Sequence, residues 1–247
     1  MRLLLTLLFA LSLGGCVSRP ANSAHLQEVA KVHTELAAAY YERAQLGVAL
    51  DELRQALQAE PDYAPAYSVR GLIHMALRED KEAEDDFQHS LRLDNVNSEA
   101  HNNYGWFLCQ RGRERESVKQ FLAALKNPLY ATPEKAYLNA GLCSQKAGEM
   151  KDAEEFLQKA LLLQPNMPEA MLGVAGLDFA NGDYTAANAS FARYAQSDGV
   201  NLSAENLWLG VRIARKVGDK NAEGSYALQL NKRFPDSHEN QLMLQGQ

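Results

Sequence analysis

The chain has 247 residues, of which 46% are hydrophobic and 23% are charged, so its bulk has the composition of a globular protein and not of a disordered one. Its 25 Lys and Arg are outnumbered by 31 Asp and Glu, and a net charge of −6 gives no sign of the basic surface that nucleic-acid binding requires. Three cysteines are too few for a small disulfide-knit scaffold.

Residues 1–15 are predicted to be a signal peptide, because Arg2 precedes an apolar run over residues 3–13. That run is too short to cross a bilayer as a helix, which takes roughly 20 residues. It ends in Leu13-Gly14-Gly15-Cys16, which resembles a bacterial lipobox. The resemblance implies cleavage before Cys16, acylation of that cysteine with palmitate, and an anchor and short linker over residues 16–29. The alternative is an ordinary signal peptide with an incidental cysteine.

The residue after the lipobox cysteine is informative about the membrane. In enterobacterial-type sorting an Asp at this position retains a lipoprotein in the inner membrane, and this chain has Val17 there. The resemblance therefore implies an outer-membrane lipoprotein that faces the periplasm.

A helical repeat fills the rest of the chain. One small residue recurs at spacings of 34, 34, 36, 34 and 35, and a second follows each of them twelve residues later. The first set is Ala37, Gly71, Gly105, Gly141, Ala175 and Gly210, and the second is Ala49, Ala83, Ser117, Ala153, Ala187 and Ala222. Small residues at these two positions let the backbones of a helical hairpin approach closely where they cross. This pattern resembles the tetratricopeptide repeat (TPR).

The predicted fold is an all-α TPR solenoid of about six repeats that form a right-handed superhelix. The repeats are expected at 30–63, 64–97, 98–131, 134–167, 168–201 and 203–236, with a C-terminal tail at 237–247. Arg70 departs from the consensus, because it stands at the usually apolar seventh position of the second repeat. The repeats leave no room for a separate catalytic domain.

Two stretches are more specific than the repeat consensus. These are His101-Asn102-Asn103-Tyr104-Gly105-Trp106-Phe107-Leu108-Cys109 and Asn139-Ala140-Gly141-Leu142-Cys143, with Asn127-Pro128-Leu129-Tyr130 between them. Together they resemble the type IV pilus biogenesis/stability lipoprotein family (PilF/PilW, the pilotin class). The resemblance implies a protein that helps the pilus secretin reach the outer membrane and multimerise. We also expect the protein to be monomeric apart from its complexes. The alternatives are an adaptor for outer-membrane protein insertion, for the peptidoglycan machinery, or for an enzyme.

The concave groove of a TPR array is lined by the first helix of each repeat, and several of its positions are apolar here. An exposed apolar stripe is typical of a docking site for a partner helix or extended segment, although side chains of neighbouring repeats also cover such positions. The predicted groove residues are Leu72, Met75, Asn103, Trp106, Leu138, Asn139, Leu142, Leu172 and Phe179. The two asparagines are expected to bond a partner's backbone or to cap their own helices.

Enzyme chemistry finds little support in the sequence. The six histidines are scattered over different repeats without metal-ligand spacing, and neither a Gly-rich phosphate loop nor a G-x-S-x-G elbow is present. We therefore expect no catalytic residue, no metal and no cofactor.

A disulfide between Cys109 and Cys143 is predicted. Once Cys16 is acylated these are the two remaining thiols, and the periplasm is oxidising. They stand at positions 12 and 10 of the first helices of consecutive repeats, which stack side by side. The alternative is a pair of buried free thiols, a common role for cysteine.

Overall fold

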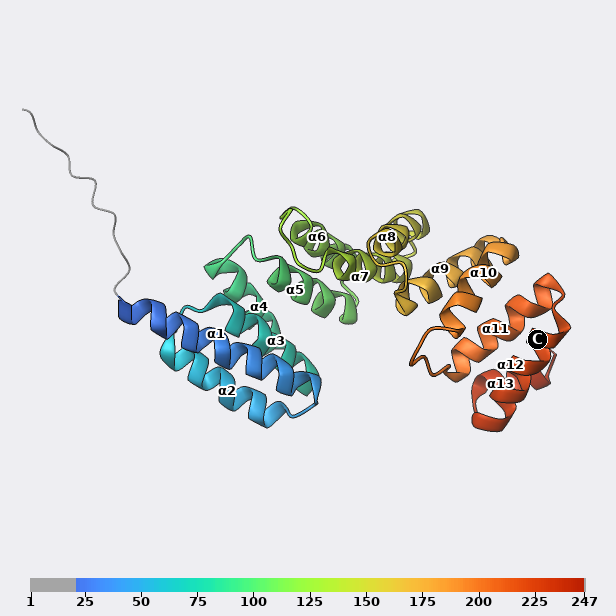
Figure 1. Ribbon diagram of the computed structural model, residues 1–247, viewed down its shortest axis with the longest axis horizontal. Coiled ribbons are helices and arrows are strands. Elements are labelled where there is room, and N and C mark those ends of the chain that lie inside the picture. Colours follow the sequence, from blue (N-terminus) through green and yellow to red (C-terminus); the bar gives the residue numbers. More distant parts are fainter. Residues whose placement is uncertain (1–20, 247) are drawn as a thin grey trace, which may run out of the picture. The chain divides into compact units, whose positions relative to one another are not determined.

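The computed structural model describes residues 21–246, and all regular secondary structure in that range is α-helical (Figure 1). In chain order the helices are α1 (Ala21–Glu42), α2 (Leu46–Ala59), α3 (Ala64–Leu77), α4 (Asp80–Leu93), α5 (Ser98–Gln110), α6 (Glu114–Ala124), α7 (Pro133–Lys146), α8 (Met150–Leu163), α9 (Pro168–Asn181), α10 (Tyr184–Ala195), α11 (Ala204–Val217), α12 (Lys220–Arg233) and α13 (His238–Leu244). Within this range no helix is long and apolar enough to span a membrane. The predicted signal peptide and the predicted lipidation site, Cys16, lie outside the described residues.

The chain divides into two compact units, of which the first ends at Ala66 and the second begins at Tyr67. In the first unit α1 packs along α2. Ala37 and Ala49, the small residues expected at their crossing, are fully buried.

In the second unit the helices form successive hairpins, with α5 on α6, α7 on α8, α9 on α10 and α11 on α12 (Figure 1). The first helix of each hairpin also contacts the second helix of the hairpin before it. In addition, α5 contacts α7, and α7 contacts α9. Each repeat therefore buries its faces against its immediate neighbours, as a TPR solenoid does.

The small residues sit where the two helices of a repeat cross. A Cβ atom built on Gly71 would lie 2.8 Å from the ring of Phe87, and one on Gly105 would lie 2.7 Å from the ring of Phe121. Both rings are fully buried. The glycine at the eighth position of the repeat therefore makes room for the bulky residue at the twenty-fourth.

Both ends of the repeat array differ from the sequence prediction. Residues 21–29, assigned to a linker, belong to α1, because no Gly or Pro interrupts the chain between Ala21 and Glu42. The C-terminal tail contains α13, whose N-cap Ser237 accepts a hydrogen bond from the Asn240 backbone. Asn240 is 1% exposed, and its side chain donates to the carbonyl of Pro235. The tail is thus a short helix packed on α11 and α12 that covers the end of the array.

The departure at Arg70 has a structural reason. Its guanidinium donates two hydrogen bonds to the carboxylate of Asp86, at 2.7 and 2.6 Å, and lies 5.0 Å from the ring centroid of Tyr67. Asp86 is 7% exposed. A bidentate pair on α3 and α4 therefore takes the place of the expected apolar contact.

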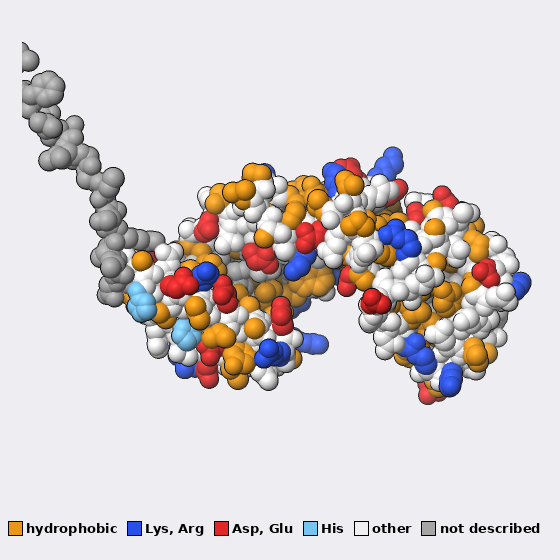
Figure 2. Space-filling view, viewed as in Figure 1, with side chains coloured by type: hydrophobic (Ala, Val, Ile, Leu, Met, Phe, Trp, Pro, Cys, Tyr) orange, Lys and Arg blue, Asp and Glu red, His pale blue; other side chains and the backbone are white. Residues whose placement is uncertain are grey.

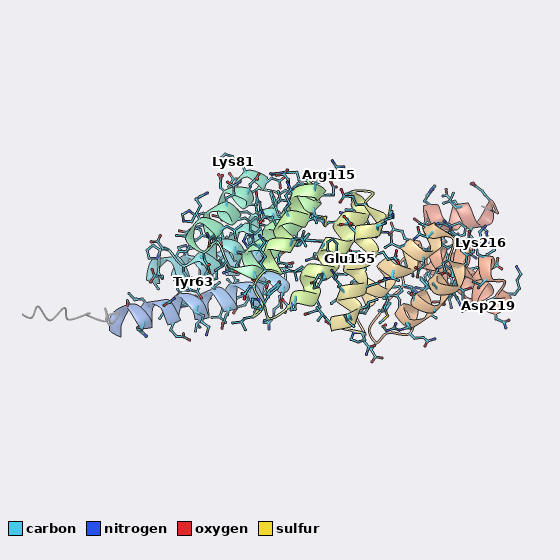
Figure 3. All side chains as sticks on the ribbon, turned by 90° about the horizontal axis from the view of Figure 1, so that it is seen from above. Tyr63, Lys81, Arg115, Glu155, Lys216 and Asp219 are labelled. Carbon is cyan, nitrogen blue, oxygen red and sulfur yellow. A yellow bond between two sulfur atoms is a disulfide. The ribbon has the colours of Figure 1, made fainter. Side chains whose placement is uncertain are left out.

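A second polar network links α4, α5 and the start of α6. Glu84 accepts hydrogen bonds from the Tyr104 hydroxyl at 2.8 Å and from Arg113 at 2.7 Å. Burial raises the pKa of Glu84, but the hydrogen bonds from Arg113 and Tyr104 outweigh it and hold the pKa below its ordinary value. Other charged side chains point outward from the helices, such as Lys81 and Arg115 (Figure 3).

This network predicts a pH dependence of stability. Because the pKa of Glu84 is lower in the folded state, its contribution is present above the unfolded pKa of about 4.3 and is lost as the pH falls through the folded value. Glu84→Gln should therefore reduce the stability difference between neutral and acidic pH by on the order of 1 kcal/mol, the upper range for a partly exposed ion pair. Urea unfolding measured between about pH 7 and pH 3 tests this. Glu82→Gln, at an exposed site on the same helix, is the control, and an equal effect of both variants would contradict the prediction.

Candidate protein-docking surface

All nine predicted groove residues are half-buried on first helices of the repeats. Each apolar member packs against the cluster of buried side chains nearest to it in the repeat array. Leu72 and Met75 pack beside Phe87 and Tyr104, while Trp106 lies against a cluster that contains both disulfide cysteines. The remainder are Leu138 and Leu142, which pack beside Leu157, and Leu172 and Phe179, which pack beside Phe191. Neighbouring repeats thus cover part of the apolar stripe, and part of each side chain stays accessible.

The structure contradicts one of the two roles expected for the asparagines, the capping of their own helices. The side-chain amide of Asn103 donates to the hydroxyl of Ser68 at 3.2 Å, and that of Asn139 donates to the side-chain oxygen of Asn102 at 3.1 Å. First helices of consecutive repeats stack side by side, so the sixth position of one repeat meets the fifth position of the repeat before it. The amides therefore join repeats to each other and do not cap their own helices.

Leu142 and Leu172 open onto a pocket of about 760 Å³ between α7, α9 and α11, which we call the α9 pocket. Its apolar wall is completed by Pro168, Val200 and Leu209. Figure 2 shows hydrophobic side chains gathered between the helices at the C-terminal end of the chain. The volume is in the range of ligand pockets, about 300–1,000 Å³, and suits a side chain or short segment of a partner.

The α9 pocket also has polar walls. The side-chain amide of Asn206 donates to the Tyr194 hydroxyl at 2.6 Å, and both residues line the pocket. Tyr194 is 6% exposed, and burial, with the nearby charge of Glu169, raises its pKa. The hydroxyl therefore stays protonated at physiological pH and is held in a fixed position.

Sequence reasoning missed much of this pocket. Gln145, Glu169, Glu205 and the loop over residues 198–201 line it, yet none stands out in the repeat pattern. One signal was available, since the spacing of 35 between Ala175 and Gly210 exceeds the usual 34. The additional residue lies in the loop between α10 and α11, where Gly199 adopts a φ of 73° that favours glycine.

The structure contains a disulfide between Cys109 of α5 and Cys143 of α7, the pairing that the sequence predicts. Their Cα atoms are 5.9 Å apart, within the usual range for a disulfide. Both cysteines are at most 2% exposed. The bond therefore joins the third and fourth repeats inside their shared core.

Histidines take part in polar contacts within repeats. His33 Nδ1 lies 2.6 Å from Glu52 Oε2, and His101 Nδ1 lies 2.7 Å from Gln120 Oε1, with the same separation of 19 residues along the chain. Across residues 21–246 no three His, Cys, Asp or Glu side chains are grouped as a metal site would require.

Stacked helical hairpins with an accessible pocket on their first helices define a TPR protein that binds other proteins. A tetratricopeptide repeat profile matches residues 134–167, the bounds that the small-residue register gives to the fourth repeat. The chain is 31% identical over 245 residues to the type IV pilus assembly protein PilF of Pseudomonas aeruginosa. The match covers 97% of this chain and 96% of the relative. It therefore belongs to the PilF family of type IV pilus assembly proteins, a family of non-enzymatic scaffolds.

Two solved structures agree with this assignment. PilW, described as a widely conserved type IV pilus biogenesis factor, superposes with a TM-score of 0.78 at 35% identity and covers 88% of this chain and 99% of its own. Pseudomonas aeruginosa PilF superposes with a TM-score of 0.85 at 29% identity and covers 90% of this chain and 100% of its own. The likeness extends over nearly the whole described repeat array.

Proposed function

We propose that this protein is an outer-membrane lipoprotein, anchored through Cys16 and facing the periplasm, that acts as a pilotin for the type IV pilus secretin. In this role it binds the secretin subunit through its groove and promotes transport to the outer membrane and assembly of the multimer. The observation that carries the proposal is the match to PilF over 97% of the chain. The sequence Leu13-Gly14-Gly15-Cys16 supports the anchor, and the accessible α9 pocket supports binding to a protein partner.

Deletion of the gene tests the proposed function in the native host. Without the protein we expect secretin subunits to remain unassembled and outside the outer membrane, while a plasmid copy restores the multimer. Membrane fractionation followed by crosslinking and detection of the secretin measures both properties. Normal multimers in the outer membrane of the deletion strain would exclude the pilotin role, and pull-down from membranes would then show whether the partner belongs to outer-membrane protein insertion or to the peptidoglycan machinery.

Lipidation has its own test. Intact mass spectrometry of the protein purified from membranes should show a chain that begins at Cys16 and carries added acyl mass. Cys16→Ala should release the protein from the outer membrane with an unchanged unfolding temperature, because the described helices begin at Ala21. An unmodified chain that starts at another residue would rule out the anchor.

If the secretin binds in the groove, a substitution in the α9 pocket should weaken its capture more than the same substitution outside the pocket. Leu142→Asp places a charge in the α9 pocket and should weaken secretin capture at least about tenfold, which corresponds to 1.4 kcal/mol. Its cost in folding stability should be about 1–2 kcal/mol, because Leu142 is only half-buried. Leu162→Asp is the matched control, since Leu162 is 82% exposed on α8. Equal capture by folded Leu142→Asp and Leu162→Asp would remove the α9 pocket from the binding surface.

A further inference from the structure

The α9 pocket exists because one groove position lacks a side chain. The ninth position of the repeat holds Leu72, Trp106 and Leu142 in the second, third and fourth repeats, and Gly176 in the fifth. A Cβ atom built on Gly176 would meet only the side-chain amide of Gln145, at 3.8 Å. The space that a large side chain fills in three other repeats is therefore open here to a side chain from outside.

The rim of the α9 pocket is acidic. Glu169, Asp198 and Glu205 are exposed at its edge, and none of the three forms an ion pair with any residue of the described chain. Among the described residues that line the pocket, none is Lys or Arg. Three unpaired carboxylates around an apolar opening favour a ligand with positive charge beside its apolar part.

Three arginines of the fifth and sixth repeats have partners other than the rim carboxylates. Arg193 donates to the carbonyl of Pro165 at 2.7 Å, and the guanidinium of Arg212 lies 4.4 Å from the ring centroid of Phe179. Arg233 donates to the carbonyl of Leu202 at 2.9 Å and also to the side chain of Asn201. These contacts leave the negative charge of the rim available to a partner.

We propose that the α9 pocket binds a segment of a protein partner that presents one large apolar side chain, Phe or Leu, flanked by Lys or Arg. The apolar side chain occupies the space over Gly176, between Leu142 and Leu172. The flanking cations lie against Glu169 and Glu205, and the fixed hydroxyl of Tyr194 is placed to bond the segment's backbone. The inference rests on the proposed function for the identity of the partner, the secretin, and on the pocket itself for the chemistry of the segment.

A phage-displayed library of random peptides, selected on the immobilised mature protein, tests the chemistry without assuming a partner. We expect the selected peptides to be enriched in Phe or Leu next to Lys or Arg. Gly176→Leu fills the pocket and should abolish the selection, whereas Gly224→Leu is the matched control, since a Cβ atom there meets nothing within 4 Å and Gly224 does not line the pocket. Enrichment of acidic peptides, or equal selection by both variants, would overturn the proposal.

Charge reversal separates the acidic rim from the apolar floor. Binding of the best selected peptide, labelled with fluorescein, should weaken about tenfold in Glu169→Lys/Glu205→Lys, and increasing salt should weaken wild-type binding in the same direction. Unchanged affinity in that variant and at high salt would overturn the charge assignment. Self-association of the mature protein that Gly176→Leu abolishes would assign the pocket to a second copy of this chain and also overturn it.

A last measurement distinguishes failure of this inference from failure of the proposed function. If the protein is the pilotin and its α9 pocket binds the secretin, the Gly176→Leu strain should accumulate unassembled secretin as the deletion strain does. Normal secretin assembly with Gly176→Leu, in a host where deletion blocks it, would overturn the pocket's assignment and leave the pilotin role intact. Normal assembly in the deletion strain, together with selective peptide binding, would support the pocket and refute the pilotin role.

Discussion

Gly105→Leu is expected to lower the free energy of unfolding by about 3 kcal/mol, the upper end of the usual range for an overpacked core. Even a Cβ atom at this position would lie 2.7 Å from Phe121, whose ring is fully buried and has no free space to enter. Helix propensity acts in the opposite direction, because Leu is a better helix former than Gly by at most about 1 kcal/mol. The packing term is larger, so the variant should be less stable. Urea unfolding measures the difference, provided that the free energy of unfolding depends equally steeply on urea concentration in both proteins.

The matched control is Gly224→Leu, which makes the same substitution inside α12. No atom lies within 4 Å of a Cβ atom built there, and Gly224 is exposed. Only helix propensity applies, so the variant should be unchanged or more stable by about 0.5–1 kcal/mol. If both variants lose the same stability, the small residues of the repeat do not mark tight helix crossings.

This contrast explains why the sequence was sufficient to predict the repeat. A glycine is required at Gly105 because the bulky side chain sixteen residues later occupies the space of a Cβ atom. The same pairing recurs in Gly71 with Phe87 and in Gly141 with Leu157. The constraint is local, since both members belong to one helical hairpin. A local constraint that repeats every 34 to 36 residues is visible as a period, and the all-α solenoid follows from it.

The α9 pocket depends on a different kind of information. Its empty position, Gly176, is unremarkable in a chain with 16 glycines, and the residues that surround it come from α7, α9, α10, α11 and a loop. Only the stacking of three consecutive repeats brings them together. The predicted groove residues Leu142 and Leu172 do line the pocket, whereas its acidic rim has no counterpart in the repeat consensus.

Contacts between repeats explain why Asn103 and Asn139 do not cap their own helices. Both stand at the sixth position of their repeats. In this chain the preceding repeat offers Ser68 and Asn102, two small polar partners at the fifth position, and the amides bond them. Ser68 and Asn102 are buried, and leaving a buried polar group without a partner costs about 1–3 kcal/mol, which favours these hydrogen bonds. A consensus position predicts where a residue lies on its helix, but it does not predict which side chain of the neighbouring repeat that residue contacts.

The sequence indicated the Cys109–Cys143 pairing through the same repeat geometry, and removal of this bond should have the largest effect on stability. Cys109→Ala/Cys143→Ala should lower the free energy of unfolding by about 3–4 kcal/mol, the chain-entropy value for a loop closed over 34 residues. The bond restricts the unfolded chain across the third and fourth repeats, so its loss should also increase the urea dependence of unfolding.

Reduction of the wild-type protein provides the control for cavity effects. Both cysteines are buried, so the alanine variant also loses two sulfur atoms from the core, whereas reduction keeps them. Reductant should destabilise the wild type by most of the same amount and should leave the double variant unchanged. Alkylation after denaturation decides whether the bond forms in the cell, because protein purified from the periplasm should label at Cys109 and Cys143 only after reduction. Two labelled thiols without reduction, together with equal stability of the wild type with and without reductant, would show that these residues are a buried thiol pair. The third and fourth repeats would then be held together by packing and by the hydrogen bond from Asn139 to Asn102.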